Sequence, residues 1–226
     1  MTDFAPDPAA DLADATLDEL RAVLAPLVAS NAAFDGWNAR AVKAAAESRG
    51  VDPDVAALCF EKPVAMVDAW FAHIDAEMAA RLPAERLEAM KIRERITRLV
   101  ETRLALLAPD REALRRAVAM LAMPPNAPTG FRLGWRSADT MWRLAGDTAT
   151  DYNHYTKRAI LAGVYAATIA VFLDDESEGW ADTRGFLARR VEGIMRFEKT
   201  KTQWLGHPER RFSMSRFIGR LRYPAV

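Results

Sequence analysis

The strongest evidence for the fold class lies between Trp135 and Glu178. This stretch begins WRSADTMWRLAGD, continues through a polar and aromatic hinge at 148–155, and then carries no charge in the 15 residues from Ala159 to Leu173. As a helix this apolar run would extend about 22 Å, short of the roughly 30 Å of hydrocarbon in a bilayer. A helix that is apolar on every side and too short to span a membrane is expected inside a bundle. We therefore predict a buried central helix.

Helical spacing dominates the rest of the chain, and the alternating apolar runs typical of strands are scarce, so we predict an all-α protein. Thr16 is a plausible N-cap with Glu19 in the capping-box position, and Pro26 is expected to kink or end the first helix. The predicted helices cover about 16–28, 39–49, 53–60, 63–81, 85–107, 110–121, 129–145, 151–174 and 178–204. The predicted divisions are a loose leader at 1–15, a three-helix unit at 16–60, a bundle at 63–205 and a tail at 208–226.

Composition favours a protein with a real core. Half of the 226 residues are hydrophobic, and the net charge is zero. The charge is unevenly spread, because residues 1–20 hold six acids and no base, whereas 184–226 hold eleven Lys or Arg and three Glu. The single cysteine, Cys59, cannot form an internal disulfide. The acidic start resembles neither a signal peptide nor a mitochondrial transit peptide, so we expect a cytoplasmic protein.

The unit at 16–60 has the spacing of a helix-turn-helix. Small residues at 44–46 and Gly50 fit the close helix approach and the turn of that motif. The segment in the position of the recognition helix, 52–60, carries two Asp and no Lys, Arg or amide. Two carboxylates facing a polyanion weaken DNA binding. We therefore predict a degenerate unit that serves packing.

Motifs for catalysis or metal binding are absent. There is no Glu-x-x-His, nucleophile elbow, dinucleotide fingerprint or phosphate loop. Asp151 with His154, and His73 with Glu77, supply two ligands each, which is more typical of surface pairs than of a metal site. The acids at 174–178 are more simply helix caps and solvated charges than paired catalytic carboxylates. We predict no catalytic residue, no metal and no cofactor.

The tail has an apolar stripe beside a basic face. Met214, Phe217, Ile218 and Leu221 follow helical spacing, with arginines interleaved and Phe212 upstream. This pattern is typical of a helix that lies in a membrane interface, although a helix docked on its own bundle has the same pattern. The predicted membrane-binding residues are Arg211, Phe212, Met214, Arg216, Phe217, Ile218, Arg220 and Leu221.

Several strings in the central stretch resemble a known family. DTMW at 139–142, AGD at 145–147, TDYN at 150–153, YTKRA at 155–159 and LAGVY at 161–165 are similar to the ubiquinone biosynthesis accessory proteins, the ninth of the coenzyme Q biosynthesis proteins. FDGW at 34–37, KIRERI at 91–96 and the DT and FL pairs at 182–187 fit as well. The resemblance covers about 16–205.

The resemblance implies a fold like that of the TetR regulators, with a disabled DNA-binding unit and no catalysis. It implies that an isoprenoid quinone intermediate or phospholipid binds in the C-terminal bundle. It also implies a homodimer, peripheral to the inner membrane, that presents the quinone to a hydroxylase of the ubiquinone pathway. The expected lipid-binding residues are Trp135, Met141, Leu161, Tyr165, Ile169 and Phe172.

The hydroxylase is expected to contact a patch around the Asp-x-x-Trp motif. The predicted partner-binding residues are Asp139, Trp142, Arg143, Asp147 and Tyr152. Two positions depart from the family pattern, because His154 stands where Trp is frequent and Arg143 where eukaryotic members carry an aromatic residue. Both lie on the predicted patch, so they leave the identity of the hydroxylase open.

Two alternatives remain open from the residues themselves. The small side chains at 162–163, 166–167 and 170 could make room for a lipid tunnel, but close helix packing needs small side chains too. A TetR-type regulator that senses an apolar ligand is the second candidate function; it would need a basic face on 38–60, where only Arg40, Lys43 and Arg49 are available. An enzyme of another kind is supported by no constellation of residues.

Overall fold

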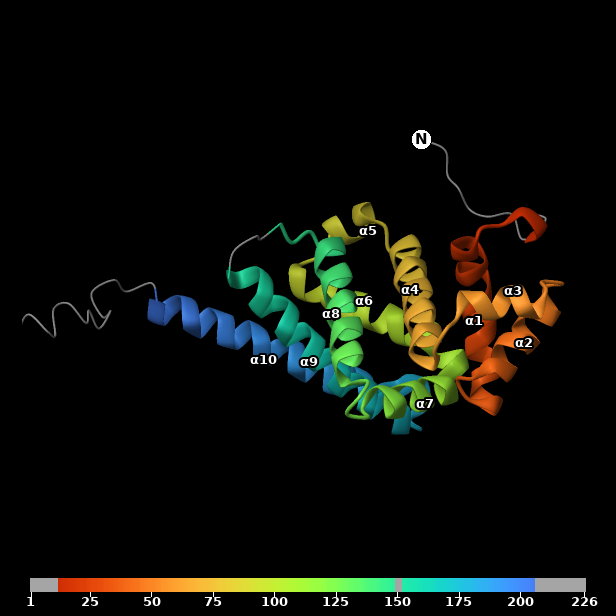
Figure 1. Ribbon diagram of the computed structural model, residues 1–226. Coiled ribbons are helices and arrows are strands. Elements are labelled where there is room, and N and C mark those ends of the chain that lie inside the picture. The colour runs from red at the N-terminus through yellow and green to blue at the C-terminus, as the bar shows by residue number, and fades with distance from the viewer. Residues whose placement is uncertain (1–11, 149–151, 206–226) are drawn as a thin grey trace, which may run out of the picture.

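A computed structural model describes residues 12–148 and 152–205, and these residues form helices without a strand. Figure 1 shows the first three α-helices at one end of the molecule and the last α-helix running out beyond the bundle at the other end. The all-α prediction is confirmed. Of the predicted leader, the structure describes the last part, where Leu12–Asp14 form a short 3-10 turn.

The N-terminal helices are α1 (Leu17–Asp35), α2 (Ala39–Ser48) and α3 (Pro53–Cys59). The predicted capping box is confirmed, since Thr16 Oγ1 accepts from the Glu19 amide and the Glu19 carboxylate accepts from the Thr16 amide. Pro26 does not end α1 as expected. Buried residues on both sides of it, Leu24, Ala25, Val28 and Ala29, hold the helix in the core, and this packing outweighs the hydrogen bond that proline removes.

The middle of the chain forms α4 (Pro63–Arg81), α5 (Ala84–Glu88), α6 (Ile92–Leu107) and α7 (Arg111–Leu121). The prediction of one helix over 85–107 was wrong, because the chain breaks between α5 and α6. Lys91 is extended and its amide donates to Glu94, which starts α6 afresh. Arg95 then donates to the carbonyls of Glu88, Met90 and Ala145, at 2.9, 2.9 and 2.8 Å. One guanidinium therefore satisfies the carbonyls of Glu88 and Met90, which a continuous helix would have paired, and also binds the carbonyl at the end of α8.

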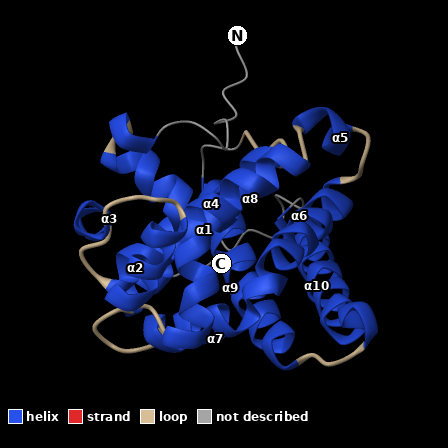
Figure 2. Cartoon of the chain, turned by 90° about the vertical axis from the view of Figure 1, so that its right-hand side faces the viewer, coloured by secondary structure: helices blue, strands red, loops and turns tan. Residues whose placement is uncertain are grey.

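The C-terminal part comprises α8 (Ala127–Leu144), α9 (Tyr152–Asp174), a 3-10 turn at Glu178–Trp180 and α10 (Ala181–Leu205). Helix α8 packs on α9, and α10 packs on α9 and α6. Figure 2, turned by 90°, shows α9 among α7, α8 and α10. Asp175 fixes the start of α10, since its carboxylate accepts from the amides of Ser177 and Thr183, each at 2.8 Å. Of the acids at 174–178, which we expected to be caps or solvated charges, Asp175 is thus a cap, whereas Asp174 is exposed and pairs with Arg115.

The prediction that α9 is buried on every side was wrong. Its inward face is covered, with Leu161, Tyr165 and Phe172 in the core, but Ala159, Gly163, Ala166 and Ala170 are exposed along the other face. By length and apolar composition His154–Asp174 could cross a bilayer, yet one face of it packs into the bundle as a core helix does. A helix of small side chains on one side thus offers an open apolar surface.

Candidate functional site

A buried polar cluster joins four helices at the centre of the bundle. Asp75 of α4 pairs with Arg103 of α6, Arg103 Nε donates to the hydroxyl of Tyr165 of α9 at 2.6 Å, and Ser137 of α8 lies 3.5 Å from Asp75. Burial raises the pKa of Asp75, although Arg103 opposes it, and burial also raises the pKa of Tyr165. Tyr165, one of the predicted lipid-binding residues, is therefore also part of a hydrogen-bonded network.

Arg103 is the residue that sequence reasoning missed. Its side chain is wholly buried, and its guanidinium lies 5.5 Å from the ring of Phe71 and 5.4 Å from that of Tyr165. Among the described residues, its Nη2 has no hydrogen-bond partner. The helical spacing could have indicated that this arginine is buried, since Arg103 lies four residues after Leu99 and four before Leu107 on the apolar stripe of α6. A charge on such a stripe indicates a buried partner, here Asp75.

The predicted lipid-binding residues fall into two groups. Met141, Leu161, Tyr165, Ile169 and Phe172 are buried in the core, and Phe172 packs edge-on against Trp180 with ring centroids 5.3 Å apart. Trp135 is half-buried at the surface of α8. It stands between Phe131 and Tyr155, with ring centroids 6.2 Å from each. A lipid would reach the first group only if the packed helices separated, whereas Trp135 borders solvent.

The rings of Phe131, Trp135 and Tyr155 form an aromatic row across α8 and α9. Phe131 is 69% exposed and Tyr155 is 62% exposed, both unusually open for aromatic residues. The exposed small residues of α9, which we call the α9 stripe, follow Tyr155 at helical spacing; they are Ala159, Gly163, Ala166 and Ala170. The row and the stripe together form an apolar surface made by two helices.

The predicted partner patch is mainly an ion-pair network that anchors the start of α9. Arg158, almost wholly buried, bridges Asp139 of α8 and Asp147 of the following loop, and Lys157 Nζ lies 2.7 Å from Asp147. Burial opposes the ionisation of Asp147, but hydrogen bonds from Lys157 and Arg158 outweigh it and lower the pKa. These charges are therefore held in place by one another.

The remaining patch residues differ in exposure. Trp142 is 7% exposed, and its indole Nε1 donates to the carbonyl of Lys157 at 3.0 Å, so most of the side chain belongs to the core. Arg143 is largely exposed and lies 2.8 Å from Asp139. The side chain of Tyr152 is outside the described part of the chain, as is the whole predicted membrane-binding tail.

No group of three His, Cys, Asp or Glu side chains within 12–148 and 152–205 could hold a metal ion. Burial lowers the pKa of His73, and Glu77 opposes this shift.

Helix α3 stands in the position of a recognition helix. It carries no Lys or Arg and exposes Leu58 and Val55. The structure therefore places apolar and acidic groups where a DNA reader has basic ones.

Comparison with known proteins supports one family. A sequence model of the COQ9 family matches residues 127–198, which hold α8, α9 and most of α10. The chain is 33% identical over 175 residues to the rat protein named "Ubiquinone biosynthesis protein COQ9, mitochondrial", an alignment that covers 74% of this chain and 56% of that one. The human protein of the same name is 32% identical over 74% of this chain and 55% of its own.

The Drosophila melanogaster relative of that name is 26% identical, over 93% of this chain and 67% of its own. The chain thus spans little more than half the length of its mammalian relatives. Among solved structures, a TetR transcriptional regulator from Nitrosomonas europaea is similar, with a TM-score of 0.62 and 22% identity, covering 76% of this chain and 96% of that one. This likeness confirms the TetR-like fold and indicates nothing about function.

Proposed function

The chain belongs to the COQ9 family, and on that premise we propose that it is a non-catalytic accessory protein of ubiquinone biosynthesis. In this role it binds an isoprenoid quinone intermediate or a phospholipid and presents the quinone to a hydroxylase of the pathway. The relatives whose names mention ubiquinone biosynthesis support the pathway.

The observation that carries the lipid-binding part is the apolar surface formed by the aromatic row and the α9 stripe. An exposed apolar area of this kind, uncharged over 159–173, is typical of an interaction site. An isoprenoid chain laid on it would gain roughly 0.8 kcal/mol for each CH₂ group removed from water. Trp135, half-buried between two exposed rings, supplies a flat apolar wall at one end.

A second copy of the chain would complete this site. Alanine and glycine let two helix backbones approach closely, and the α9 stripe consists of nothing else. Gly163 has no heavy atom within 4 Å of where a Cβ would lie, so this side of α9 is open. We place the dimer interface on the α9 stripe, with the lipid held at its edge beside the aromatic row.

The hydroxylase would contact the end of α8 beside this surface. Among the patch residues whose side chains are described, Arg143 is the exposed one, and the buried bridge from Arg158 holds Asp139 beneath it. Membrane attachment through the arginines and aromatics of the tail remains a prediction from sequence, because the tail is outside the described residues. The relatives are named as mitochondrial, and we place this chain at the membrane where its own ubiquinone pathway operates.

Extraction of purified protein followed by mass spectrometry tests the proposal. We expect an isoprenoid quinone or a phospholipid to co-purify with the unmodified chain. Tyr155→Asp places a charge in the aromatic row and should remove the lipid, whereas Ala119→Asp, at an exposed position of α7, should retain it. Protein that is reproducibly empty, and whose melting temperature does not respond to added ubiquinone, would overturn the proposal.

A TetR-type regulator is the alternative, favoured by the fold alone. Its DNA contacts would have to come from α2, because α3 carries Asp54 and begins at the Asp52 cap without a basic residue. A mobility-shift assay at low salt, where phosphate contacts contribute most, separates the two functions. Binding of duplex DNA that is lost in Arg40→Gln would favour the regulator.

A further inference from the structure

We propose that a trough over the outer face of α6 binds an anionic group, a phosphate or a carboxylate, that is attached to an apolar body. The trough has a volume of about 530 Å³ and lies between the ends of α4 and α5 on one side and the turn before α10 on the other. It is separate from the α8–α9 surface, so it does not depend on the proposed function.

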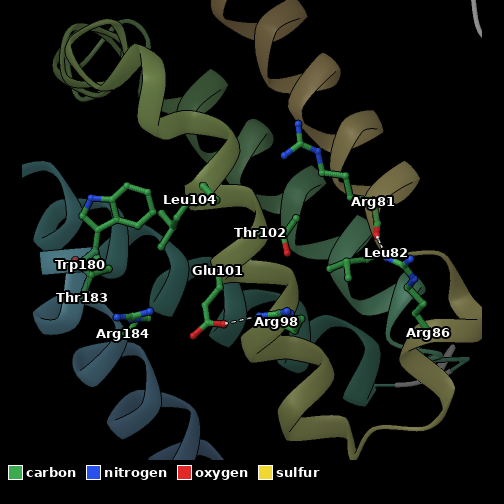
Figure 3. Close-up of a pocket in the computed structure, with 12 residues that line it drawn as sticks. Arg81, Leu82, Arg86, Arg98, Glu101, Thr102, Leu104, Trp180, Thr183 and Arg184 are labelled. Atoms are coloured by element: carbon green, nitrogen blue, oxygen red, sulfur yellow. Dashed lines mark hydrogen bonds and ion pairs between the residues drawn. The ribbon is translucent and has the colours of Figure 1, made fainter.

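Four arginines from different elements line the trough. Arg81 ends α4, Arg86 lies on α5, Arg98 on α6 and Arg184 on α10, and Glu101 is the one carboxylate among the lining residues. Figure 3 shows Arg98 and Glu101 on α6, with Arg184 on the α10 side and Arg81 and Arg86 on the opposite side. Guanidinium groups gathered around one hollow attract anions and match the bidentate geometry of phosphate and carboxylate.

These arginines form only weak interactions with other residues of the described chain. Arg98 lies 3.8 Å from Glu101, and Arg81 lies 3.8 Å from Glu77, and both distances exceed that of a hydrogen bond. Arg86 donates to the carbonyl of Arg81 at 3.4 Å. Within the described part of the chain, Arg184 forms no ion pair. Most of the donor capacity of the four groups is therefore available to a ligand.

The backbone beside Arg184 is shaped around its side chain. Gly179 has a φ of 58°, and a Cβ there would lie 3.2 Å from Nη2 of Arg184. Trp180 follows with a φ of 57°, which is uncommon for a residue with a side chain. A glycine at 179 lets the turn keep this conformation and lets the guanidinium lie over it.

The trough also has apolar walls. Leu82 and Leu104 are buried side chains that border it, and Trp180 borders it with its ring braced against Phe172. An adjoining hollow of about 520 Å³ continues along α6 and α10, where Arg93 and Arg98 meet Glu94, Glu101 and Glu192. The excess of positive charge therefore lies in the trough and not in the adjoining hollow, and the apolar walls lie in the trough as well, which suits an anionic head on an apolar body.

Binding of inorganic diphosphate and of vesicles by the full chain tests this site. We would measure calorimetric titration with diphosphate at low ionic strength, and co-sedimentation with phosphatidylcholine vesicles with or without phosphatidylglycerol. Arg98→Gln/Arg184→Gln should weaken the binding that depends on the anion about tenfold. The matched control, Arg40→Gln/Arg49→Gln on the surface of α2 and its end, removes the same charge elsewhere and should leave the binding unchanged.

The two probes distinguish the source of the anion. A loss of diphosphate binding in the trough variant indicates a soluble phosphorylated ligand. If the trough variant loses binding only to vesicles that contain phosphatidylglycerol, the natural ligand is a lipid headgroup. The proposal is overturned if the unmodified chain binds neither probe, or if the trough variant and the control variant lose binding equally. Melting temperatures of both variants confirm that each is folded.

Discussion

The hydroxyl of Tyr165 accepts a hydrogen bond from Nε of Arg103 over 2.6 Å, in the middle of the bundle. The two residues lie on α9 and α6, and the ion pair with Asp75 extends the contact to α4. A buried ion pair is weak evidence for stability, but breaking one is costly because the remaining charge loses its partner. The network therefore specifies how α9 sits against α6 and α4, while the apolar residues around it supply most of the driving force.

Tyr165→Phe tests this network. The change keeps the ring and removes the acceptor of the buried Arg103 Nε, so the free energy of unfolding should fall by roughly 1–3 kcal/mol. Tyr155→Phe is the matched control, since Tyr155 is 62% exposed and the same change should cost little there. Urea denaturation measures both. Equal stability of the two variants would show that the Arg103 hydrogen bond contributes nothing net.

Arg158→Met should destabilise the protein by roughly 3–5 kcal/mol, because it leaves Asp139 and Asp147 as neighbouring carboxylates without their buried partner. Arg143→Met removes the exposed ion pair with Asp139 and should cost less than about 1 kcal/mol. The two midpoints of thermal or urea unfolding give the comparison. A smaller loss for Arg158→Met than for Arg143→Met would contradict the bridging role of Arg158.

The proposed contact with the hydroxylase is best tested at Arg143. From sequence alone, Trp142→Ala is expected to spare stability and weaken partner binding. The burial of Trp142 and its hydrogen bond to Lys157 change that expectation to a loss of about 3–5 kcal/mol. Arg143→Ala should leave the fold intact and weaken capture of the pathway hydroxylase, as measured by surface plasmon resonance, with Arg189→Ala on α10 as the exposed control. Unchanged affinity in Arg143→Ala would place the partner elsewhere.

Asp175 should make stability depend on acid pH. Hydrogen bonds from Ser177 and then Thr183 hold the pKa of its carboxyl well below the usual range. A depressed pKa contributes stability above the unfolded-state value, about 4, and this contribution is lost as the pH falls from about 5. Asp175→Asn should therefore lower stability at neutral pH and flatten its decline on acidification. Asp174→Asn, which removes the exposed carboxylate that pairs with Arg115, is the neighbouring control and should cost less than about 1 kcal/mol at neutral pH.

Ala166→Arg tests the assembly. If two copies meet along the α9 stripe, a long charged side chain there should convert the dimer to a monomer, because an unpaired charge is costly in an apolar interface. Ala119→Arg on α7 provides the same charge at another exposed site and should leave the mass unchanged. Light scattering after gel filtration measures the molar mass of both variants. A monomeric unmodified chain, or a dimer in both variants, would refute this interface.

Local signals in the sequence were enough for much of the secondary structure. The capping box at Thr16 was readable because both of its bonds lie within four residues, and Gly36 and Gly50 mark turns with positive φ. The break between α5 and α6 was missed because the apolar spacing continues through it; local bonds from Lys91 and Arg95 form the break, and the bond from Arg95 to the carbonyl of Ala145, fifty residues away, ties it to α8. Pro26 was misjudged for the same reason, since the core around it decides the conformation.

The order of amino acids was enough to predict the all-α class, the lack of basic residues in α3, the lack of catalytic motifs and, through the strings at 139–165, the family. These features are either local or independent of which residues meet in space. The packing of distant segments, in contrast, leaves α9 open on one side, buries Trp142 in the core and brings arginines from four elements to one trough. A one-dimensional pattern shows that a face is apolar or charged, but what covers that face depends on how distant helices pack.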